Sequence, residues 1–243
     1  MNSKTFIIIL SVVTLGFSSC CNYTQTSTSM KSETDTASFY IGYSFGAQLK
    51  GLGVTDPNIS AIIAGINYAL TKKDPPAEQQ SMVTYINKFI EKKMAERAEK
   101  NRKDGEAFLE KNGKKSDVVT TESGLQYKIE TKGEGPVPTS SDMVKVHYRG
   151  TFLDGTEFDS SIKRGEPFQF QAGGGVIRGW SEAIQLMPVG SKWTLYIPSD
   201  LAYGPQGYYN NIAPNETLIF EVELLEIVPQ EKPEEAAEHN HEH

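Results

Sequence analysis

The chain is poor in cysteine and in basic charge, and each shortage excludes a class of protein. Its only two cysteines, Cys20 and Cys21, are adjacent. Neighbouring cysteines rarely pair with each other and there is no third cysteine, so a disulfide framework is excluded. The formal net charge of −7 provides no basic stripe to neutralise phosphates, which argues against a nucleic-acid partner. The acidity is explained by solubility alone.

The longest apolar run lies near the N-terminus, over residues 6–17, and is too short to cross a bilayer. A lysine precedes it, and two serines separate it from Cys20, an order typical of an export signal. The placement resembles the lipobox of bacterial lipoproteins, in which the cysteine after the small residues is acylated. We therefore expect a signal peptide over residues 1–19 and lipidation of Cys20. Acylation of Cys21, or plain secretory cleavage, are the alternatives. The expected location is extracytoplasmic, at the periplasm or outer membrane of a Gram-negative bacterium.

The next part of the chain changes from a polar segment to a helical one. Residues 20–36 are rich in Ser and Thr and predict a flexible tether. Residues 37–115 have helical periodicity, with apolar side chains at i, i+3, i+4 and i+7. Gly51 and Gly53 are expected to end a first helix. Asp56-Pro57 predicts the start of a second, with Asp56 as N-cap.

A third and longer helix is predicted from Glu78 to Asn112. Its first half has an apolar stripe, whereas residues 96–105 are polar on every face, as in helices that bridge domains through solvent. Two short helices and half a long one provide a thin core. We therefore expect a second copy of the chain to pair with the apolar stripe in a homodimer. A monomeric helical collar packed on the next domain is the alternative.

From Thr121 onward the apolar period is two, which predicts strands punctuated by Gly and Pro. One short helix is expected near residues 179–186. The predicted fold class is α+β: an all-α N-terminal domain with a long connecting helix, then an antiparallel sheet wrapped around one short helix over residues 121–228. Residues 229–243 are acidic and are expected to be disordered.

Three motifs in this domain predict a small apolar pocket. They are Val146-His147-Tyr148, Gly155-Thr156-Glu157-Phe158-Asp159-Ser160-Ser161 and Val176-Ile177-Arg178-Gly179-Trp180. Aromatic side chains with few polar groups are how ligand sites are usually built. No nucleophile–base pair and no metal-ligand cluster accompanies them. Any chemistry must therefore act through shape, desolvation and a few hydrogen bonds, and no cofactor is expected.

These motifs carry a resemblance. Residues 124–227 resemble the FKBP-type peptidyl-prolyl cis-trans isomerases. Residues 38–112 resemble the helical dimerisation domain of the macrophage-infectivity-potentiator branch of that family. The further matching motifs are Pro167-Phe168, Pro188-Val189-Gly190, Leu201-Ala202-Tyr203-Gly204 and Phe220-Glu221-Val222-Glu223-Leu224. The resemblance implies an FKBP-like sheet, isomerase activity on proline-containing unfolded or nascent segments, and possible macrolide inhibitor binding.

The resemblance also implies the site. Catalytic roles fall on Tyr148, Phe158, Asp159, Ile177, Trp180, Tyr203 and Phe220, and substrate-binding roles on Phe168, Val176, Tyr208, Ile212 and Arg164. Trp180 would form the floor, and Asp159 would act electrostatically, held by Tyr148 and Arg164. His147 looks catalytic by residue type, but strand alternation points it away from Tyr148 and predicts a structural role.

Some features leave the function open. The loop of residues 207–214 departs from the commoner family pattern, and Asn211 within it puts substrate preference and macrolide affinity in doubt. The tail histidines His239, His241 and His243 could bind a metal weakly, although an incidental solvated tail is favoured and no metal site is predicted. The main alternative function is a client-binding chaperone module with little turnover. A receptor or adhesin has no supporting feature beyond the anchor.

Overall fold

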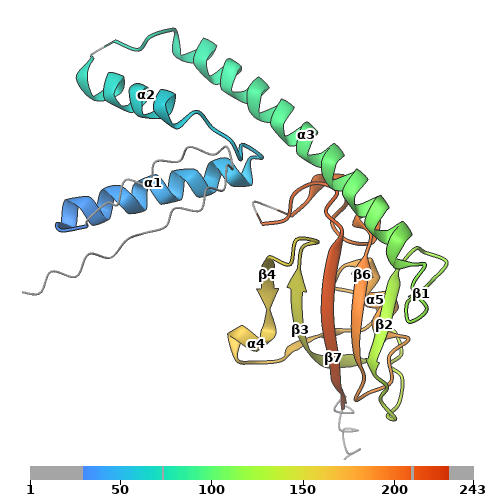
Figure 1. Cartoon of the computed structure of the whole chain (residues 1–243). Helices are drawn as coiled ribbons and strands as arrows, with labels where there is room; N and C mark the ends of the chain where they lie inside the picture. Colours follow the sequence, from blue (N-terminus) through green and yellow to red (C-terminus); the bar gives the residue numbers. More distant parts are fainter. Residues whose placement is uncertain (1–29, 73, 209–210, 230–243) are drawn as a thin grey trace, which may run out of the picture. The chain divides into compact units, whose positions relative to one another are not determined.

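The computed structural model describes residues 30–72, 74–208 and 211–229. In these residues three long helices precede a seven-stranded antiparallel sheet with two short helices (Figure 1). The α+β class is therefore confirmed. The predicted signal peptide, Cys20 and the acidic tail lie outside the described residues. The chain divides into two compact units, residues 1–43 and 44–243.

The first helix, α1, spans Glu33–Gly51 and so begins inside the segment expected to be a tether. A capping box explains the difference. The Asp35 N–H donates to Ser32 Oγ and the Ser32 N–H donates to Asp35 Oδ2, each at 3.1 Å. These reciprocal bonds satisfy donors that a helix start leaves open. The end of the helix at Gly51 agrees with the prediction.

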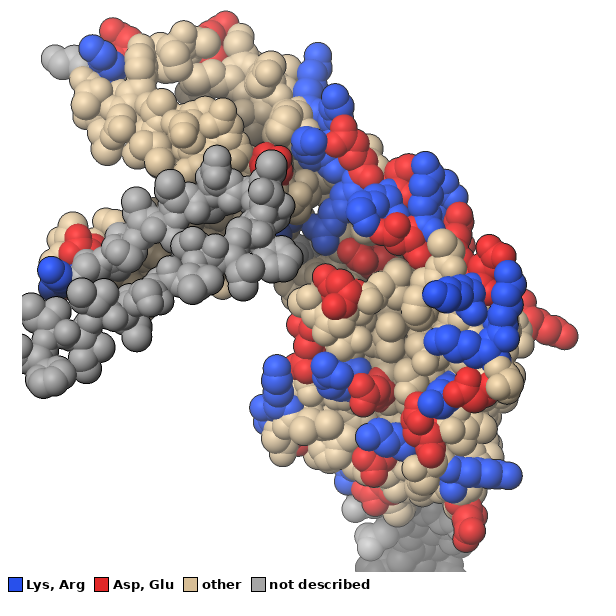
Figure 2. Space-filling model, viewed as in Figure 1, with Lys and Arg blue, Asp and Glu red and all other residues tan. Residues whose placement is uncertain are grey.

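The second helix, α2, spans Ile59–Thr71, and its N-cap is Asn58 instead of the predicted Asp56. The side chain of Asn58 accepts a hydrogen bond from the Ala61 N–H at 3.0 Å. No residue of α1 or α2 is buried. Helix α2 contains no charged residue, and it is almost uniformly tan in Figure 2, whereas blue and red side chains alternate along the next helix.

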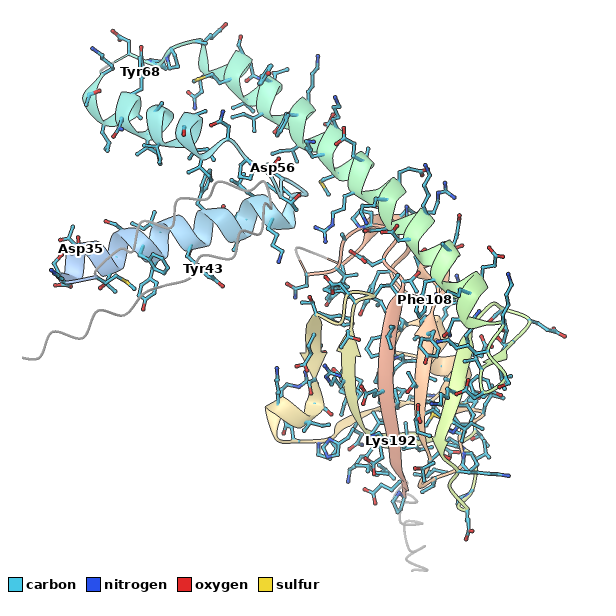
Figure 3. All side chains as sticks on the ribbon, in the orientation of Figure 1. Asp35, Tyr43, Asp56, Tyr68, Phe108 and Lys192 are labelled. Carbon is cyan, nitrogen blue, oxygen red and sulfur yellow. The ribbon has the colours of Figure 1, made fainter. Side chains whose placement is uncertain are left out.

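The third helix, α3, spans Gln79–Asn112, within one residue of the prediction. At 1.5 Å per residue its length is about 50 Å. The prediction that residues 96–105 have no face to bury was wrong, because Gly105 is buried. Phe108 points from α3 toward the sheet (Figure 3) and its ring lies 5.7 Å from that of Tyr196. The second half of α3 therefore packs on the sheet domain.

The sheet has the strand order β1-β2-β6-β7-β3-β4, with β5 paired to β3. The strands are β1 (Val119–Thr120), β2 (Gln126–Thr131), β3 (Met143–Thr151), β4 (Glu157–Ser160), β5 (Phe168–Gln171), β6 (Lys192–Ile197) and β7 (Leu218–Val228). The long strand β7 lies between β6 and β3. Strands β1 and β4 have two and four residues and are too short for a periodic signal.

Two α-helices of one or two turns interrupt the strands. Helix α5, Arg178–Ile184, is the short helix predicted near residues 179–186, and its buried side chains join the core of the sheet domain. Helix α4, Ser161–Arg164, was not predicted. Ser160 caps it, and Gly165 ends it in the left-handed region at φ 82°. Two 3-10 turns, Ser199–Leu201 and Gly204–Gln206, follow β6.

Candidate active site

An aromatic cavity of about 370 Å³ lies in the sheet domain. Every predicted site residue except Ile212 lines this cavity, and Gly175, which was not predicted, lines it as well. The lining residues are Tyr148, Phe158, Asp159, Arg164, Phe168, Gly175, Val176, Ile177, Trp180, Tyr203, Tyr208 and Phe220. They come from β3, β4, β5, β7, α4, α5 and the loops beside them, so residues far apart in the sequence meet at one point.

Trp180 on α5 is 3% exposed and makes edge-on contacts with three other pocket rings, those of Tyr148, Phe168 and Phe220. Its ring centroid lies 5.0 Å from that of Tyr148 and 5.2 Å from that of Phe220, with interplanar angles of 88° and 84°. Aromatic pairs favour this arrangement because the positive edge of one ring meets the negative face of the other. These contacts hold the pocket rings in a fixed arrangement.

Two glycines allow the pocket walls to approach so closely. A Cβ on Gly150 of β3 would lie 2.7 Å from Phe158 Cζ and 2.8 Å from Phe220 Cε1. A Cβ on Gly179 would lie 2.6 Å from Ile197 Cγ2. Both distances are shorter than atoms tolerate, so a side chain at either position would displace pocket walls or the helix that carries Trp180.

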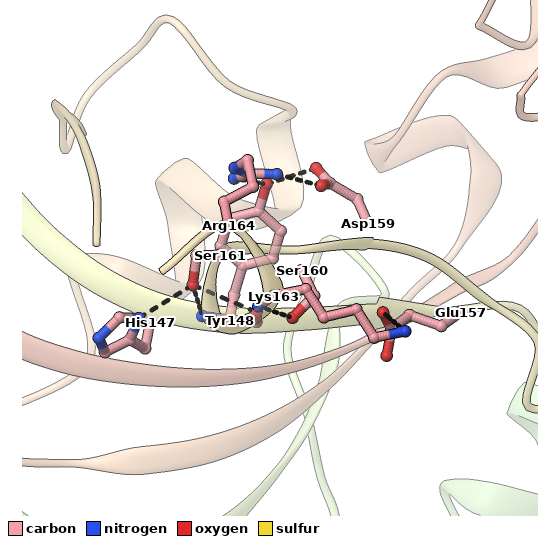
Figure 4. A network of polar contacts seen from close by, with 8 residues as sticks. All are labelled: His147, Tyr148, Glu157, Asp159, Ser160, Ser161, Lys163 and Arg164. Carbon is pink, nitrogen blue, oxygen red and sulfur yellow. Dashed lines mark hydrogen bonds and ion pairs between the residues drawn. The ribbon is translucent and has the colours of Figure 1, made fainter. Parts of the chain in front are cut away.

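The single carboxylate of the pocket, Asp159, is held from two sides (Figure 4). The Tyr148 hydroxyl donates to Asp159 Oδ2, and the Arg164 guanidinium donates to Asp159 Oδ1. Arg164 Nη2 also donates to the Tyr148 oxygen at 2.8 Å. Burial, followed by the bond to Asp159, raises the pKa of Tyr148 to about 12. The hydroxyl therefore keeps its proton at neutral pH and remains a donor to the carboxylate.

The backbone of Tyr148 has an unusual partner, the side chain of Ser161. Strand β3 pairs with β5 up to Val146 and with β4 from Arg149 onward, so this side of Tyr148 has no neighbouring strand. The buried Ser161 hydroxyl accepts from the Tyr148 N–H at 2.8 Å and donates to the Tyr148 carbonyl at 3.3 Å. One hydroxyl thus replaces a strand at the point where the sheet changes partners.

His147 lies outside the pocket lining, as strand alternation predicted. Its Nδ1 lies 3.1 Å from Ser161 Oγ, and Figure 4 shows its ring on the far side of Ser161 from Asp159. The imidazole therefore contacts the hydroxyl that supports Tyr148 and does not face the carboxylate.

The pocket rim consists of Tyr203 and Tyr208, whose ring centroids are 4.8 Å apart. Burial raises the pKa of the Tyr203 hydroxyl. Asn211 is exposed, and its N–H donates to the Tyr208 carbonyl at 3.2 Å. Ile212, which was predicted to bind substrate, is not among the residues that line the cavity, and its side chain is 4% exposed. The Ile212 carbonyl instead accepts from the Tyr208 N–H at 2.8 Å, which closes the loop.

Sequence reasoning also missed residues that support the site. Ser161 ends a recognised motif, but its bonds to the Tyr148 backbone could not be predicted, because a buried serine and an exposed one look alike in sequence. Gly150 and Gly179 adjoin recognised motifs, but only the packing distances reveal why glycine is needed. Within the described ranges, no group of three or more His, Cys, Asp or Glu side chains is arranged to hold a metal ion.

Comparisons with known proteins match both parts of the chain. Residues 135–225 match the family described as FKBP-type peptidyl-prolyl cis-trans isomerase, and residues 34–129 match the domain amino-terminal to it. The FKBP-type 22 kDa peptidyl-prolyl cis-trans isomerase of Escherichia coli K12 is 46% identical over 195 residues, covering 79% of this chain and 94% of that protein. The outer membrane protein MIP of Legionella longbeachae is 38% identical over 231 residues, covering 92% and 98%.

A solved structure agrees with these sequence matches. The crystal structure of FkpA from Escherichia coli is similar with a TM-score of 0.60 and 34% identity, over 82% of this chain and 98% of that one. The family models, the similar sequences and the similar solved structure therefore agree on one family. The chain belongs to the FKBP-type peptidyl-prolyl cis-trans isomerases and has the amino-terminal domain that accompanies them.

Proposed function

We propose that the aromatic cavity binds the proline of an X-Pro segment and catalyses rotation of its peptide bond. The observation that carries this proposal is the lone carboxylate, Asp159, fixed by Tyr148 and Arg164 at the side of an otherwise aromatic pocket. Amide resonance gives peptide rotation a barrier of about 18–20 kcal/mol. X-Pro isomerisation therefore takes tens to hundreds of seconds without a catalyst.

The pocket would lower this barrier by binding the twisted amide better than the planar one. When the amide twists, resonance is lost and its carbonyl becomes less polar. A dry aromatic cavity therefore disfavours the planar ground state relative to the twisted transition state, which is differential binding. No bond is broken, so no nucleophile is required.

Each pocket residue has a role in this proposal. Trp180 forms the floor under the proline ring, and the other aromatic and aliphatic lining residues form the walls. Ile177 is the N-cap of α5, so its N–H is not used in helix bonding and is assigned to a substrate carbonyl. The Tyr203 hydroxyl donates to another carbonyl. Asp159 acts through its charge, because both of its oxygens already accept hydrogen bonds.

Protease-coupled isomerisation of a short X-Pro peptide tests this assignment. The protein would begin at residue 30, so that the capping box of α1 is kept. Tyr203→Phe is expected to lower kcat/KM because it removes a pocket donor. The matched control is Tyr127→Phe, since Tyr127 stacks on Trp193 with ring centroids 4.3 Å apart and does not line the pocket. Suppression of client aggregation without isomerisation by the unaltered chain would instead favour the client-binding chaperone alternative.

We also propose that the N-terminal helices pair with a second copy of the chain. Large apolar side chains remain exposed along α1, α2 and the first half of α3, among them Ile41, Ile63, Leu70 and Ile86 at 71%, 53%, 80% and 53% exposure. Large apolar side chains exposed on a soluble protein often mark an association surface, and each of these helices exposes several. Two pockets in one dimer would provide avidity for unfolded segments with several prolines. Sedimentation that finds a monomer at micromolar concentration would support the helical-collar alternative.

The proposed location is extracytoplasmic, with a lipid on Cys20. One relative is named an outer membrane protein, and the predicted signal sequence ends at the cysteine pair. Among the described residues, no helix is long and apolar enough to span a bilayer. Metabolic labelling with a fatty-acid analogue tests the anchor. Cys20→Ala is expected to abolish the label, and Cys21→Ala to retain it.

Macrolide binding is proposed for the same cavity, since its aromatic walls suit a large apolar ring system. Asn211 is exposed and is not among the residues that line the cavity. A macrolide is therefore expected to inhibit isomerisation competitively. An inhibitor that leaves kcat/KM unchanged at saturating concentration would contradict this.

A further inference from the structure

The polar second half of α3 contacts a connector, defined here as residues 214–217, which joins the pocket rim to β7. Asn101 Nδ2 donates to the Pro214 carbonyl at 2.9 Å. In the opposite direction, Asn215 Nδ2 donates to the Ala98 carbonyl at 3.3 Å. The first two connector residues are thus bonded to α3 from both sides.

The last two connector residues also meet α3. Arg97 Nη2 lies 3.3 Å from Glu216 Oε1, and their side chains are 29% and 13% exposed. Burial raises the pKa of the Glu216 carboxyl, and Arg97 opposes that shift. At the next position, a Cβ on Gly105 would lie 2.3 Å from Thr217 Oγ1, so only glycine lets the helix approach this closely.

The three α3 residues form one face of the helix. Arg97, Asn101 and Gly105 are four residues apart, and side chains at this spacing lie one above the other. This stripe was missed in the sequence because two of its members are polar and the third is glycine. In the structure it is an interface built from hydrogen bonds and close backbone packing.

The connector is tied in turn to the pocket rim. Asn215 has φ 58°, the only positive value among the described residues other than glycine. Its N–H donates to the Gly204 carbonyl at 2.9 Å, directly after the rim residue Tyr203. At its other end the connector leads into β7 and the pocket wall residue Phe220. The position of the connector therefore affects two sides of the cavity.

We propose that the Arg97–Asn101–Gly105 face of α3 is a positioning surface for the substrate pocket. It holds the connector and thereby sets the rim at Tyr203 and Tyr208, which determines the preference for the residue before proline. These α3 residues touch no substrate and are positioning residues. The inference rests on the proposed function of the pocket, and it makes the connecting helix a part of the enzyme's specificity.

The test uses two variants that loosen the contact in different ways, each made in the full chain. Gly105→Ala pushes against Thr217, whereas Thr217→Ala in the same chain removes the obstructing oxygen. Asn215→Gly deletes the bond to Ala98 and keeps a residue that accepts positive φ. Arg97 is unsuitable because its Nη1 also donates to the Lys50 carbonyl at 3.2 Å. Arg102→Ala is the matched control, since Arg102 bonds only Glu99 and Glu106 of the same helix.

The measurement is kcat/KM for two peptides that differ only in the residue before proline, at a temperature well below melting. Partial unfolding lowers both values by the same factor, so only a displaced rim changes their ratio. We expect Gly105→Ala to lower kcat/KM for the preferred peptide by about three- to tenfold, since small misplacements are costly. The ratio of the two kcat/KM values changes as well. Adding Thr217→Ala to Gly105→Ala restores both kcat/KM and the ratio. Asn215→Gly shifts the ratio in the same direction, and Arg102→Ala leaves it unchanged.

Two results would overturn the inference. One is an unchanged ratio in both Gly105→Ala and Asn215→Gly. The other is an equal change in Arg102→Ala. If Gly105→Ala fails to fold, Asn215→Gly alone decides the outcome. If the unaltered chain has no isomerase activity, both the proposed function and this inference are overturned. If the unaltered chain is active but the variants keep its kcat/KM ratio, only this inference is overturned.

Discussion

Replacing Tyr148 by phenylalanine isolates the electrostatic part of the proposed mechanism. The substitution removes one oxygen and leaves the ring, which is 7% exposed and packs against Trp180, Phe168 and Phe220. The lost oxygen donates to Asp159 and accepts from Arg164. After the change, Asp159 keeps only Arg164 as its partner in this network. The aromatic walls should remain where they are.

The magnitude follows from the kind of bond that is lost. A hydrogen bond to a charged group contributes about 1.5–3 kcal/mol when water is excluded. The side chains of Asp159 and Arg164 are 42% and 43% exposed, so water replaces part of the loss. We therefore expect about 1–2 kcal/mol. If this is expressed fully in the transition state, kcat/KM falls roughly 5- to 30-fold.

The assay is isomerisation of a short X-Pro peptide, with urea unfolding of the same samples to measure stability. Tyr127→Phe is the control for loss of a tyrosine hydroxyl elsewhere in the domain. An unchanged kcat/KM in Tyr148→Phe would refute the reasoning, because Asp159 would then need no orientation by Tyr148. A fall in kcat/KM matched by an equal fall for Tyr127→Phe would refute it as well.

Four further outcomes are expected. The pKa values of Tyr148 and Tyr203 are raised, so both hydroxyls stay protonated to a higher pH than free tyrosine. When isomerisation is followed by NMR exchange, kcat/KM should therefore not change with pH up to about pH 10. An inflection below this pH would contradict the assignment. Asn112→Ala leaves the buried Gln126 amide oxygen without its donor, and should lower the free energy of urea unfolding by about 1–3 kcal/mol. Gly179→Ala should reduce kcat/KM, since its methyl group would strike Ile197; normal activity would show that α5 shifts freely. Ile63→Asp should convert the dimer to monomer in sedimentation, and a dimer that persists would place the interface elsewhere.

Sequence patterns predicted those parts of the molecule whose residue types are distinctive. Trp180, Tyr148 and Asp159 stand in spaced motifs, and they meet in one cavity. The helix from Gln79 to Asn112 was also predicted within one residue, since its boundaries follow from length and composition. Ile212 was assigned to the pocket through its place in the resembled family's pattern, in a loop that departs from that pattern, and it does not line the cavity.

The contacts between α3 and the sheet domain could not be predicted in the same way. In the sequence, Arg97, Asn101 and Gly105 look like a solvent-exposed face of the helix. Their partners lie in the connector, residues 214–217, more than a hundred residues later in the chain. Only the fold brings Pro214 to Asn101. The start of α1 was missed for a simpler reason, since the Ser32–Asp35 capping box is a short signal inside a polar segment.

The Ser161 hydroxyl makes the Tyr148 amide a natural reporter for hydrogen–deuterium exchange. Most amides of β3 are protected by neighbouring strands and exchange when the sheet opens. The Tyr148 amide is protected by one side chain, so it can exchange when α4 alone moves aside. Because α4 also carries Arg164, such local openings release the guanidinium from Asp159 at the same moment. The exchange rate of the Tyr148 amide proton therefore reports how often the Arg164–Asp159 interaction breaks in solution.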